Sequence, residues 1–214
     1  WIRPTSFKHT GLFPEQVSNW KWIGETLKRA EVRGRATSSV LNLFGYTGGA
    51  TLAASQAGAD VVHVDGSKVA LTWARENAEL SGLKDKPIRW ILDDIRAFVR
   101  REIKRGNKYD GIIMDPPAFG HGPKKELWRI EEHFLEFLDE CKQLLKENPL
   151  FFVVNGYASG YSALTYKNNL QELLKEYNGS LEVGELTIRE KSGNRLLPSG
   201  IFARWNVTEL IKQP

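Results

Sequence analysis

This chain of 214 residues contains a single cysteine, Cys141, and only four histidines. One cysteine cannot form an internal disulfide, so a disulfide-stapled secreted scaffold is excluded and a reducing compartment, the cytoplasm, is expected. The histidines are scattered along the chain without the spacing of zinc ligands, so no metal site is expected.

Long hydrophobic runs are also lacking. No stretch of about 18 apolar residues is present, so no membrane span or membrane partner is expected. No signal peptide is visible, and the chain starts at Trp1 without a methionine, so a fragment or a trimmed chain is expected. The net charge of +4 is mildly basic and permits a nucleic-acid partner without requiring one. The length suits one α/β domain with a short appendage.

Glycine is concentrated where an apolar run, residues 40–44, ends in the turn Gly45-Tyr46-Thr47-Gly48-Gly49. An alanine-rich helix start follows, and these glycines allow positive φ angles and the close approach of a ligand. The next apolar run, residues 61–64, ends at Asp65, where doubly wound folds hold a nucleotide ribose. The pattern predicts either a nucleotide-type ligand or a plain βαβ turn. The dinucleotide motif G-x-G-x-x-G is absent, which disfavours a dehydrogenase.

The remaining periodicity predicts alternating strands and helices. Further strands are expected at residues 88–92, 109–114, 150–154, 181–189 and 201–207, and helices at 16–30, 67–80, 95–104, 124–146 and 162–177. No helix separates the last two strands, so they are expected to form an antiparallel hairpin. The predicted fold is α/β and doubly wound, with five βα units followed by a hairpin.

Seven short segments carry a family resemblance. They are Gly11-Leu12-Phe13-Pro14-Glu15-Gln16, Asn42-Leu43-Phe44-Gly45-Tyr46-Thr47-Gly48-Gly49, Asp65-Gly66-Ser67, Trp73-Ala74-Arg75-Glu76-Asn77, Asp93-Asp94, Asp115-Pro116-Pro117-Ala118-Phe119 and Gly184-Glu185-Leu186-Thr187-Ile188. With them the chain resembles the class I S-adenosylmethionine (SAM) methyltransferases over nearly its whole length, and more narrowly the large-subunit (23S) rRNA methyltransferase group. The resemblance implies a Rossmann-like fold with a seven-stranded, mostly parallel sheet. It also implies an entry segment and helix at residues 1–38 and a methyltransferase domain at 39–214.

The resemblance also implies the residues that bind SAM and its product S-adenosylhomocysteine (SAH). Residues 45–48 would wrap the methionine part of SAM, and Asp65 would accept hydrogen bonds from the ribose, or else cap the next helix. Asp94 would read the adenine amino group, with Asp93 as the one-position alternative. The full expected set is Phe13, Gln16, Gly45, Tyr46, Thr47, Gly48, Asp65, Gly66, Ser67, Asp93, Asp94, Ile95 and Asp115. For Phe13 the alternative is a hydrophobic staple before a helix.

Asp115, Pro116 and Pro117 are the expected catalytic residues. Two prolines stiffen the loop, so that Asp115 and nearby carbonyls can orient a substrate nitrogen for in-line methyl transfer. The alternative is a proline-stiffened exit from a strand. Phe119 is expected to stack on a base. In the amino-methylating relatives the aromatic residue directly follows the second proline, whereas Ala118 intervenes here.

A thiol is missing where C5 methylation of cytosine would need one. In the related 5-methylcytosine enzymes the cysteine lies after the fifth strand, where this chain has Asn155-Gly156-Tyr157-Ala158-Ser159. Cys141 lies on an apolar helix stripe and is expected in the core. A nitrogen or oxygen acceptor is therefore favoured over C5.

The expected substrate is a base in rRNA, and this expectation rests on the family resemblance. Two alternatives stay open: a small-molecule or protein methyltransferase on the same fold, and a non-catalytic RNA-binding module that retains SAM. Helix 95–104 and the residues after it carry a basic side that could touch phosphates or simply be solvated. The sequence predicts no oligomeric state.

Overall fold

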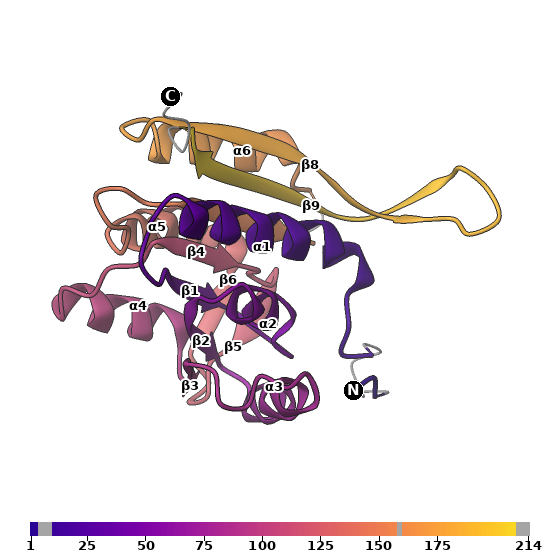
Figure 1. Cartoon of the computed structure of the whole chain (residues 1–214), viewed down its shortest axis with the longest axis horizontal. Helices are drawn as coiled ribbons and strands as arrows, with labels where there is room; N and C mark the ends of the chain where they lie inside the picture. The colour runs from indigo at the N-terminus through magenta and orange to yellow at the C-terminus, as the bar shows by residue number, and fades with distance from the viewer. Residues whose placement is uncertain (4–9, 158–159, 209–214) are drawn as a thin grey trace.

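A computed structural model describes residues 1–3, 10–157 and 160–208. Its main sheet has seven strands in the order β3-β2-β1-β4-β7-β9-β8 (Figure 1), which confirms the predicted sheet. The parallel strands are β1 (Ser39–Leu43), β2 (Asp60–Asp65), β3 (Ile88–Leu92), β4 (Gly111–Met114) and β7 (Phe151–Gly156). The closing hairpin of β8 (Gly179–Arg189) and β9 (Leu196–Val207) is antiparallel, as expected, and pairs with the sheet through β7 and β9.

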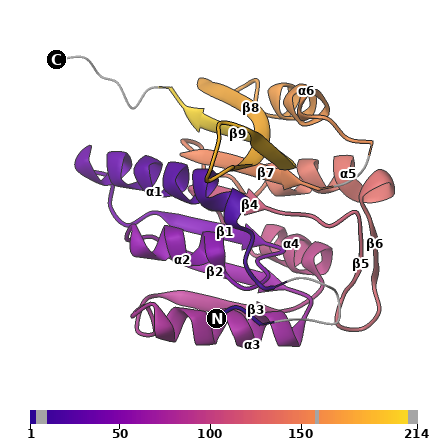
Figure 2. The same ribbon diagram turned by 90° about the vertical axis from the view of Figure 1, so that its right-hand side faces the viewer.

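Helices cover both faces of this sheet, so the fold has three layers (Figure 2). One face carries α1 (Val17–Val32), which follows a short 3-10 turn η1 (Pro14–Gln16), together with α2 (Gly49–Gln56) and α3 (Lys68–Leu80). The other face carries α4 (Ile95–Lys104), α5 (Ile130–Lys142) and α6 (Ala163–Leu173). This is the arrangement that alternating βα units produce, because right-handed crossovers place successive helices on the sheet faces.

The central strands are buried on both faces. Ile112 and Met114 of β4 pack into the apolar cluster beneath α4, α5 and α6, whereas Ile113 packs into the cluster beneath α1 and α2. Strands covered on both sides read as continuous apolar runs, which is why the sequence revealed them. Ile23 and Leu27 of α1 belong to the second cluster, so α1 is part of the same core. The expected division of the chain into an entry segment with a helix, residues 1–38, and a methyltransferase domain, residues 39–214, stays a prediction.

The helix expected at residues 124–146 is shorter than predicted. Residues 119–129 instead form a two-stranded antiparallel hairpin of β5 (Phe119–His121) and β6 (Leu127–Arg129), and α5 begins at Ile130 and ends at Lys142. Trp128 explains the difference, because its ring is buried and its Nε1 donates to the carbonyl of Pro117 at 2.7 Å. This long-range contact holds the segment extended despite its helix-forming residues.

In the part of the chain that the structure describes, no helix is both long and apolar enough to cross a bilayer.

Candidate active site

The turn after β1 has an unusual backbone. Phe44, Tyr46 and Gly48 all have positive φ angles, 57°, 47° and 93°. Left-handed conformations are uncommon for bulky residues and are found mainly where the surrounding structure enforces them, often at functional sites. Gly48 is the N-cap residue of α2, so the turn brings the first amides of that helix to the carboxyl edge of the sheet.

Side chains from beneath support this turn. A Cβ on Gly45 would lie 2.4 Å from the His63 ring, and one on Gly49 would lie 2.5 Å from the Trp20 ring. Packing inside the protein is therefore one reason for glycine at these two positions, and the expectation that they also allow a ligand to approach stays a prediction. His63 is fully buried, accepts or donates a 2.8 Å hydrogen bond with Thr51, and its pKa is lowered to about 3 by burial.

Asp65 connects the turn to the next helix. One carboxylate oxygen accepts a hydrogen bond from the backbone amide of Tyr46 at 2.8 Å, and the other accepts one from the backbone amide of Ser67 at 2.7 Å. The N-cap of α3 is Ser67, whose hydroxyl accepts the amide of Ala70, so Asp65 itself is not the cap. Burial raises the pKa of Asp65, and the two backbone hydrogen bonds oppose that shift.

The two acids after β3 have different partners. Asp94 caps α4 by accepting the amide of Ala97 at 2.8 Å, whereas Asp93 forms an ion pair with Arg101. Ile95 is almost completely buried in the core. Gly66 lies against the loop of the β5–β6 hairpin, since a Cβ there would be 3.4 Å from Gly122. The roles of these residues toward adenine stay predictions.

Asp115 lies at the end of β4, next to the turn and to η1. Gln16 donates from Nε2 to the Asp115 carboxylate at 3.3 Å and to the Tyr157 hydroxyl at 2.9 Å. Burial, together with the neighbouring carboxylate of Glu15, raises the pKa of Asp115 to about 7. Such a carboxyl group can change its protonation state close to neutral pH, which is typical of groups that handle protons.

Two residues of this cluster were missed by the sequence prediction. Glu15 is 6% exposed, and its carboxylate is one of the charges that raise the pKa of Tyr157 and of Asp115. The Tyr157 ring packs on Phe13 with 5.6 Å between centroids, and burial raises its pKa. The available signal was position: Glu15 precedes the expected Gln16, and Tyr157 directly follows the carboxyl end of β7.

A cavity of about 60 Å³ lies at this cluster and is lined by Phe13, Gln16, the turn after β1, Asp115 and Asn155. It is far smaller than the roughly 300–1,000 Å³ of a typical small-molecule site, so it has room for a small reacting group rather than a whole cofactor. The row of Asp65, Gly66 and Asp94 continues from it along the sheet edge. The polar groups along this edge fit SAM. Carboxylates such as that of Asp65 can accept hydrogen bonds from ribose hydroxyls, and the N-terminus of α2 can bind the carboxylate of the methionine part.

Phe119 does not line this cavity. It lies on β5 with 56% of its surface exposed, and its ring meets His121 edge-on at 5.0 Å between centroids. Pro117 is tied to the same hairpin through Trp128. The expected stacking role of Phe119 stays a prediction, and its exposure leaves the ring free to meet a ligand that approaches from solvent.

Cys141 lies on the buried face of α5 and is completely buried in the core, as predicted, and burial raises its pKa. Within the described ranges no three His, Cys, Asp or Glu side chains are grouped as metal ligands.

The expected basic side of α4 is largely neutralised. Arg100 pairs with Glu136 and Glu140, Arg101 pairs with Asp93, and Arg105 pairs with Glu102. Arg96 and Lys108 donate to backbone carbonyls. Of the two alternatives for this surface, the pairing favours a structural role, because paired cations have little charge left for phosphates.

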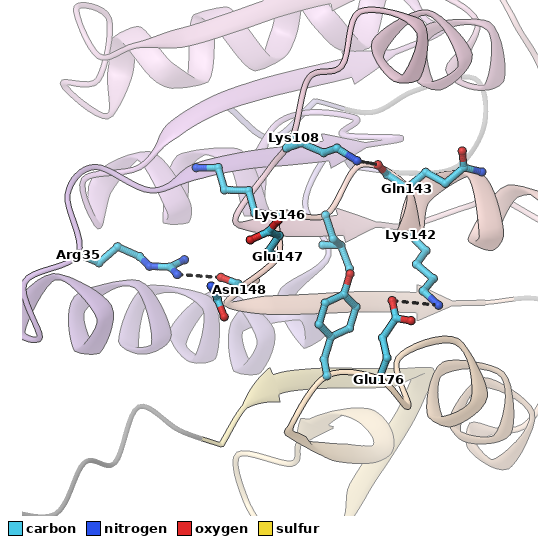
Figure 3. Close-up of a pocket in the computed structure, with 10 residues that line it drawn as sticks. Arg35, Lys108, Lys142, Gln143, Lys146, Glu147, Asn148 and Glu176 are labelled. Carbon is cyan, nitrogen blue, oxygen red and sulfur yellow. Dashed lines mark hydrogen bonds and ion pairs between the residues drawn. The ribbon is translucent and has the colours of Figure 1, made fainter.

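A cavity of about 850 Å³ lies at the opposite edge of the sheet (Figure 3). Its walls carry Arg35, Lys108, Lys142 and Lys146, but these cations also have partners within the chain. Arg35 and Lys146 both pair with the buried Asp110, each at 2.7 Å. This network joins the segments before β1, before β4 and after α5, and we interpret it as structural.

Comparison with known proteins agrees with this geometry. Residues 6–161 match the family model described as S-adenosylmethionine-dependent methyltransferase. The ribosomal RNA large subunit methyltransferase K of Neisseria meningitidis is 29% identical over 161 residues, which cover 74% of this chain and 43% of that protein. The crystal structure of a SAM-dependent methyltransferase from Agrobacterium tumefaciens is 41% identical with a TM-score of 0.89, covering 94% of this chain and 65% of that one.

A third structure, SMU.776 complexed with SAH, is 21% identical with a TM-score of 0.68 and covers 92% of this chain and 50% of that one, which shows a shared fold. The chain thus spans between about two fifths and two thirds of the length of these relatives. Because the family model covers most of the sequence, this chain belongs to the S-adenosylmethionine-dependent methyltransferase family.

Proposed function

We propose that this protein transfers the methyl group of SAM to a nitrogen or oxygen atom of a base in RNA, with ribosomal RNA as the expected substrate. The observation that carries the proposal is the half-buried carboxyl group of Asp115, which lines a small cavity beside the glycine-rich turn and whose pKa is raised to about 7. The RNA part is supported by the similarity to a large-subunit rRNA methyltransferase.

SAM supplies an activated methyl group on a sulfonium. The chain's part is to hold the cofactor, and Asp65 is suited to this because each of its carboxylate oxygens accepts only one backbone hydrogen bond. A carboxylate has about four acceptor positions, so two remain for ribose hydroxyls. The first amides of α2 are suited to a negatively charged group, since the helix dipole is positive there.

Asp115 is suited to orient the acceptor atom and to take part in removing its proton. Above pH 7 the carboxylate can accept a hydrogen bond from an amino or ring N–H, and this interaction strengthens as positive charge develops on the nitrogen. Gln16 fixes the carboxylate from one side, and Pro116 and Pro117 stiffen the chain that follows. Alignment is the main contribution that such a site makes to an in-line displacement.

A C5 acceptor is disfavoured because it requires a thiol that adds to the ring. Cys141 is the one cysteine of the chain, and it is buried on the inner face of α5 and does not line the cavity. A free thiol in the core also fits a reducing compartment such as the cytoplasm. An RNA base would have to leave its stack to reach Asp115.

The test is transfer of tritiated methyl from SAM into the RNA, protein and small-molecule fractions of a strain that lacks the gene, followed by digestion. Label in one RNA nucleoside, absent with Asp115→Asn, is the expected result, and the methyl position identifies the acceptor atom. Label in a protein or small molecule alone would overturn the RNA substrate. Label at C5 of a pyrimidine would overturn the nitrogen-or-oxygen assignment.

A further inference from the structure

Two β-hairpins project at the carboxyl edge of the sheet, on either side of Asp115. The first is the small hairpin, residues 119–129, which starts four positions after Asp115 and contacts Gly66 and Asp94 with its loop. The second is the arm, residues 186–200, which comprises the end of β8, the start of β9 and the loop between them. The small hairpin covers the end of β2, and the arm belongs to β8 and β9. In the sheet order β3-β2-β1-β4-β7-β9-β8, these strands lie on opposite sides of β4, which ends next to Asp115.

The arm extends well past the end of its neighbour. β9 pairs with β7 only as far as Ile201, opposite Gly156 at the carboxyl end of β7. Residues 196–200 and the part of β8 opposite them therefore lie beyond the sheet edge, as Figure 1 shows for the yellow hairpin that runs past the start of α1. The base of the arm touches the site, since a Cβ on Gly200 would lie 2.8 Å from the Tyr157 ring.

Both hairpins carry cations that have no partner. The small hairpin has Lys124 and Lys125, both exposed, whereas its Glu126 carboxylate accepts the backbone amide of Lys124. The arm has Arg189 and Lys191, both exposed, and its acid Glu190 is already paired with Arg195 at 2.6 Å. Among the described residues nothing neutralises these four charges, in contrast to the paired arginines of α4.

Apolar groups accompany the charges. Phe119 is 56% exposed on the small hairpin, and Leu196 and Leu197 are 52% and 62% exposed on the arm. The small hairpin thus has an exposed aromatic ring beside its cations, a combination that is typical of surfaces that bind single-stranded nucleic acid, in which rings stack on bases and cations contact phosphates. The arm supplies apolar surface without a ring.

We infer that the small hairpin and the arm form a two-sided clamp for the phosphate backbone of an RNA strand, on either side of the base presented to Asp115. The inference rests on the proposed function and adds the surface that holds its substrate. Lys124 and Lys125 contact phosphates on one side of the target base, and Arg189 and Lys191 contact those on the other. The phosphate contacts are thus assigned to the clamp and not to the basic side of α4, for which the sequence left phosphate binding and simple solvation as alternatives.

The experiment measures binding of large-subunit rRNA, purified from a strain that lacks the gene, by filter binding at several KCl concentrations. The variants are Lys124→Glu with Lys125→Glu, and Arg189→Glu with Lys191→Glu. The matched control is Lys86→Glu with Lys104→Glu, which makes the same charge change on exposed lysines at the opposite edge of the sheet. Alanine versions of both pairs guard against misfolding, and SAH binding by calorimetry reports an intact cofactor site.

Each hairpin variant should raise the Kd about tenfold or more and flatten the slope of log Kd against log salt by roughly 1–2, as expected for two lost phosphate contacts. The control should change the Kd by less than about twofold. Hairpin variants that bind like the control, while the wild-type protein binds and methylates RNA, overturn the clamp alone. A wild-type protein that neither binds nor methylates RNA overturns the proposed function as well. Unchanged RNA binding with an altered oligomeric mass would instead assign the arm to contact with a second copy.

Discussion

At the residue scale, the proximity of Glu15 to Asp115 is the main electrostatic feature of the site. The Glu15 carboxylate is one of the two causes that raise the pKa of Asp115 to about 7. Like charges disfavour ionisation, so removing one of them lowers the pKa of the other. Burial is the larger of the two causes, and Glu15 adds to it, so Glu15 helps to set the pH at which Asp115 becomes a carboxylate.

Glu15→Gln is expected to shift the pH at half-maximal methyl transfer downward, by roughly half to one pH unit, because the Asp115 carboxylate forms more easily without the second charge. The measurement is the pH dependence of kcat in the tritium-transfer assay. Glu25→Gln on the exposed side of α1 is the control and should leave the profile in place. An unshifted profile for Glu15→Gln would separate Glu15 from the chemistry.

Asp115→Asn is expected to lower turnover by about 100-fold or more while SAM affinity stays within about tenfold. It should also stabilise the fold at pH 8 by about 1–3 kcal/mol, because the raised pKa means that ionising the buried carboxyl group costs stability above pH 7. That gain should shrink as the pH falls from 7 toward 4, where the wild-type carboxyl group is protonated in the folded state. Thermal unfolding of the variant and the wild-type protein at pH 8 and at pH 4 measures this gain in stability. A variant that is less stable than the wild-type protein at pH 8 would contradict the raised pKa of Asp115.

Asp65→Ala is expected to weaken SAM binding by about 1–3 kcal/mol, since it removes a charged acceptor and frees the amides of Tyr46 and Ser67. Calorimetric titration with SAM measures the effect. Asp60→Ala, an exposed acid at the other end of β2, serves as the control. Equal affinities for the two variants would remove Asp65 from the cofactor site.

At the element scale, β1, α2 and β2 are joined by a buried polar chain beneath the glycine-rich turn. Asn42 donates to Thr51 at 2.8 Å, and Thr51 is hydrogen-bonded to His63 at the same distance. The His63 ring also occupies the space below Gly45. The turn is therefore held by its neighbours, which accounts for the positive φ angles of Phe44 and Tyr46.

Because the pKa of His63 falls to about 3 in the fold, the unfolded chain takes up a proton there first as the pH decreases. The contribution of the neutral ring to stability is complete above about pH 6.5 and should decline by about 1.4 kcal/mol per pH unit below it. Urea unfolding of the wild-type protein and His63→Gln at pH 7.5 and 5 tests this. Their stability difference should narrow at pH 5. Comparing the two proteins cancels Asp115, whose titration changes stability in the opposite direction. A constant difference would show that His63 takes up its proton at the same pH in the folded and the unfolded chain.

The β5–β6 hairpin is the element that sequence periodicity assigned wrongly. Residues 124–129 contain good helix formers, and the helix pattern of α5 begins just after them. The buried Trp128 and its bond to the Pro117 carbonyl decide the conformation, and both depend on a partner that local propensity does not include.

At the scale of the whole molecule, the two edges of the sheet have different roles. The carboxyl edge holds the candidate active site, and the amino edge is closed by Asp110. Asp110 is 3% exposed. Its carboxylate accepts hydrogen bonds from the side chains of Arg35 and Lys146 and from the backbone amide and the hydroxyl group of Ser39. Separation of the two edges allows stability and activity to be tested independently.

Asp110→Asn is expected to lower the free energy of unfolding by about 2–4 kcal/mol, because two cations lose their shared partner. Affinity for SAH should not change, since the candidate cofactor site lies at the other edge. Urea unfolding and calorimetry measure the two quantities, with the exposed Asp85→Asn as the control. A loss of SAH affinity in the folded variant would show that the two edges are coupled.

The sequence by itself determined the five alternating βα units, the antiparallel hairpin that closes the chain, and the burial of Cys141. These features follow from local periodicity, turn residues and apolar runs, which are written in consecutive residues. The tertiary structure alone decided that Glu15 and Tyr157 join Asp115, and that the arginines of α4 are paired. It also decided that residues 119–129 form a hairpin and that Asp110 closes the far edge. Gln16 and Tyr157 are 141 positions apart, and such contacts depend on how the finished sheet brings distant segments together.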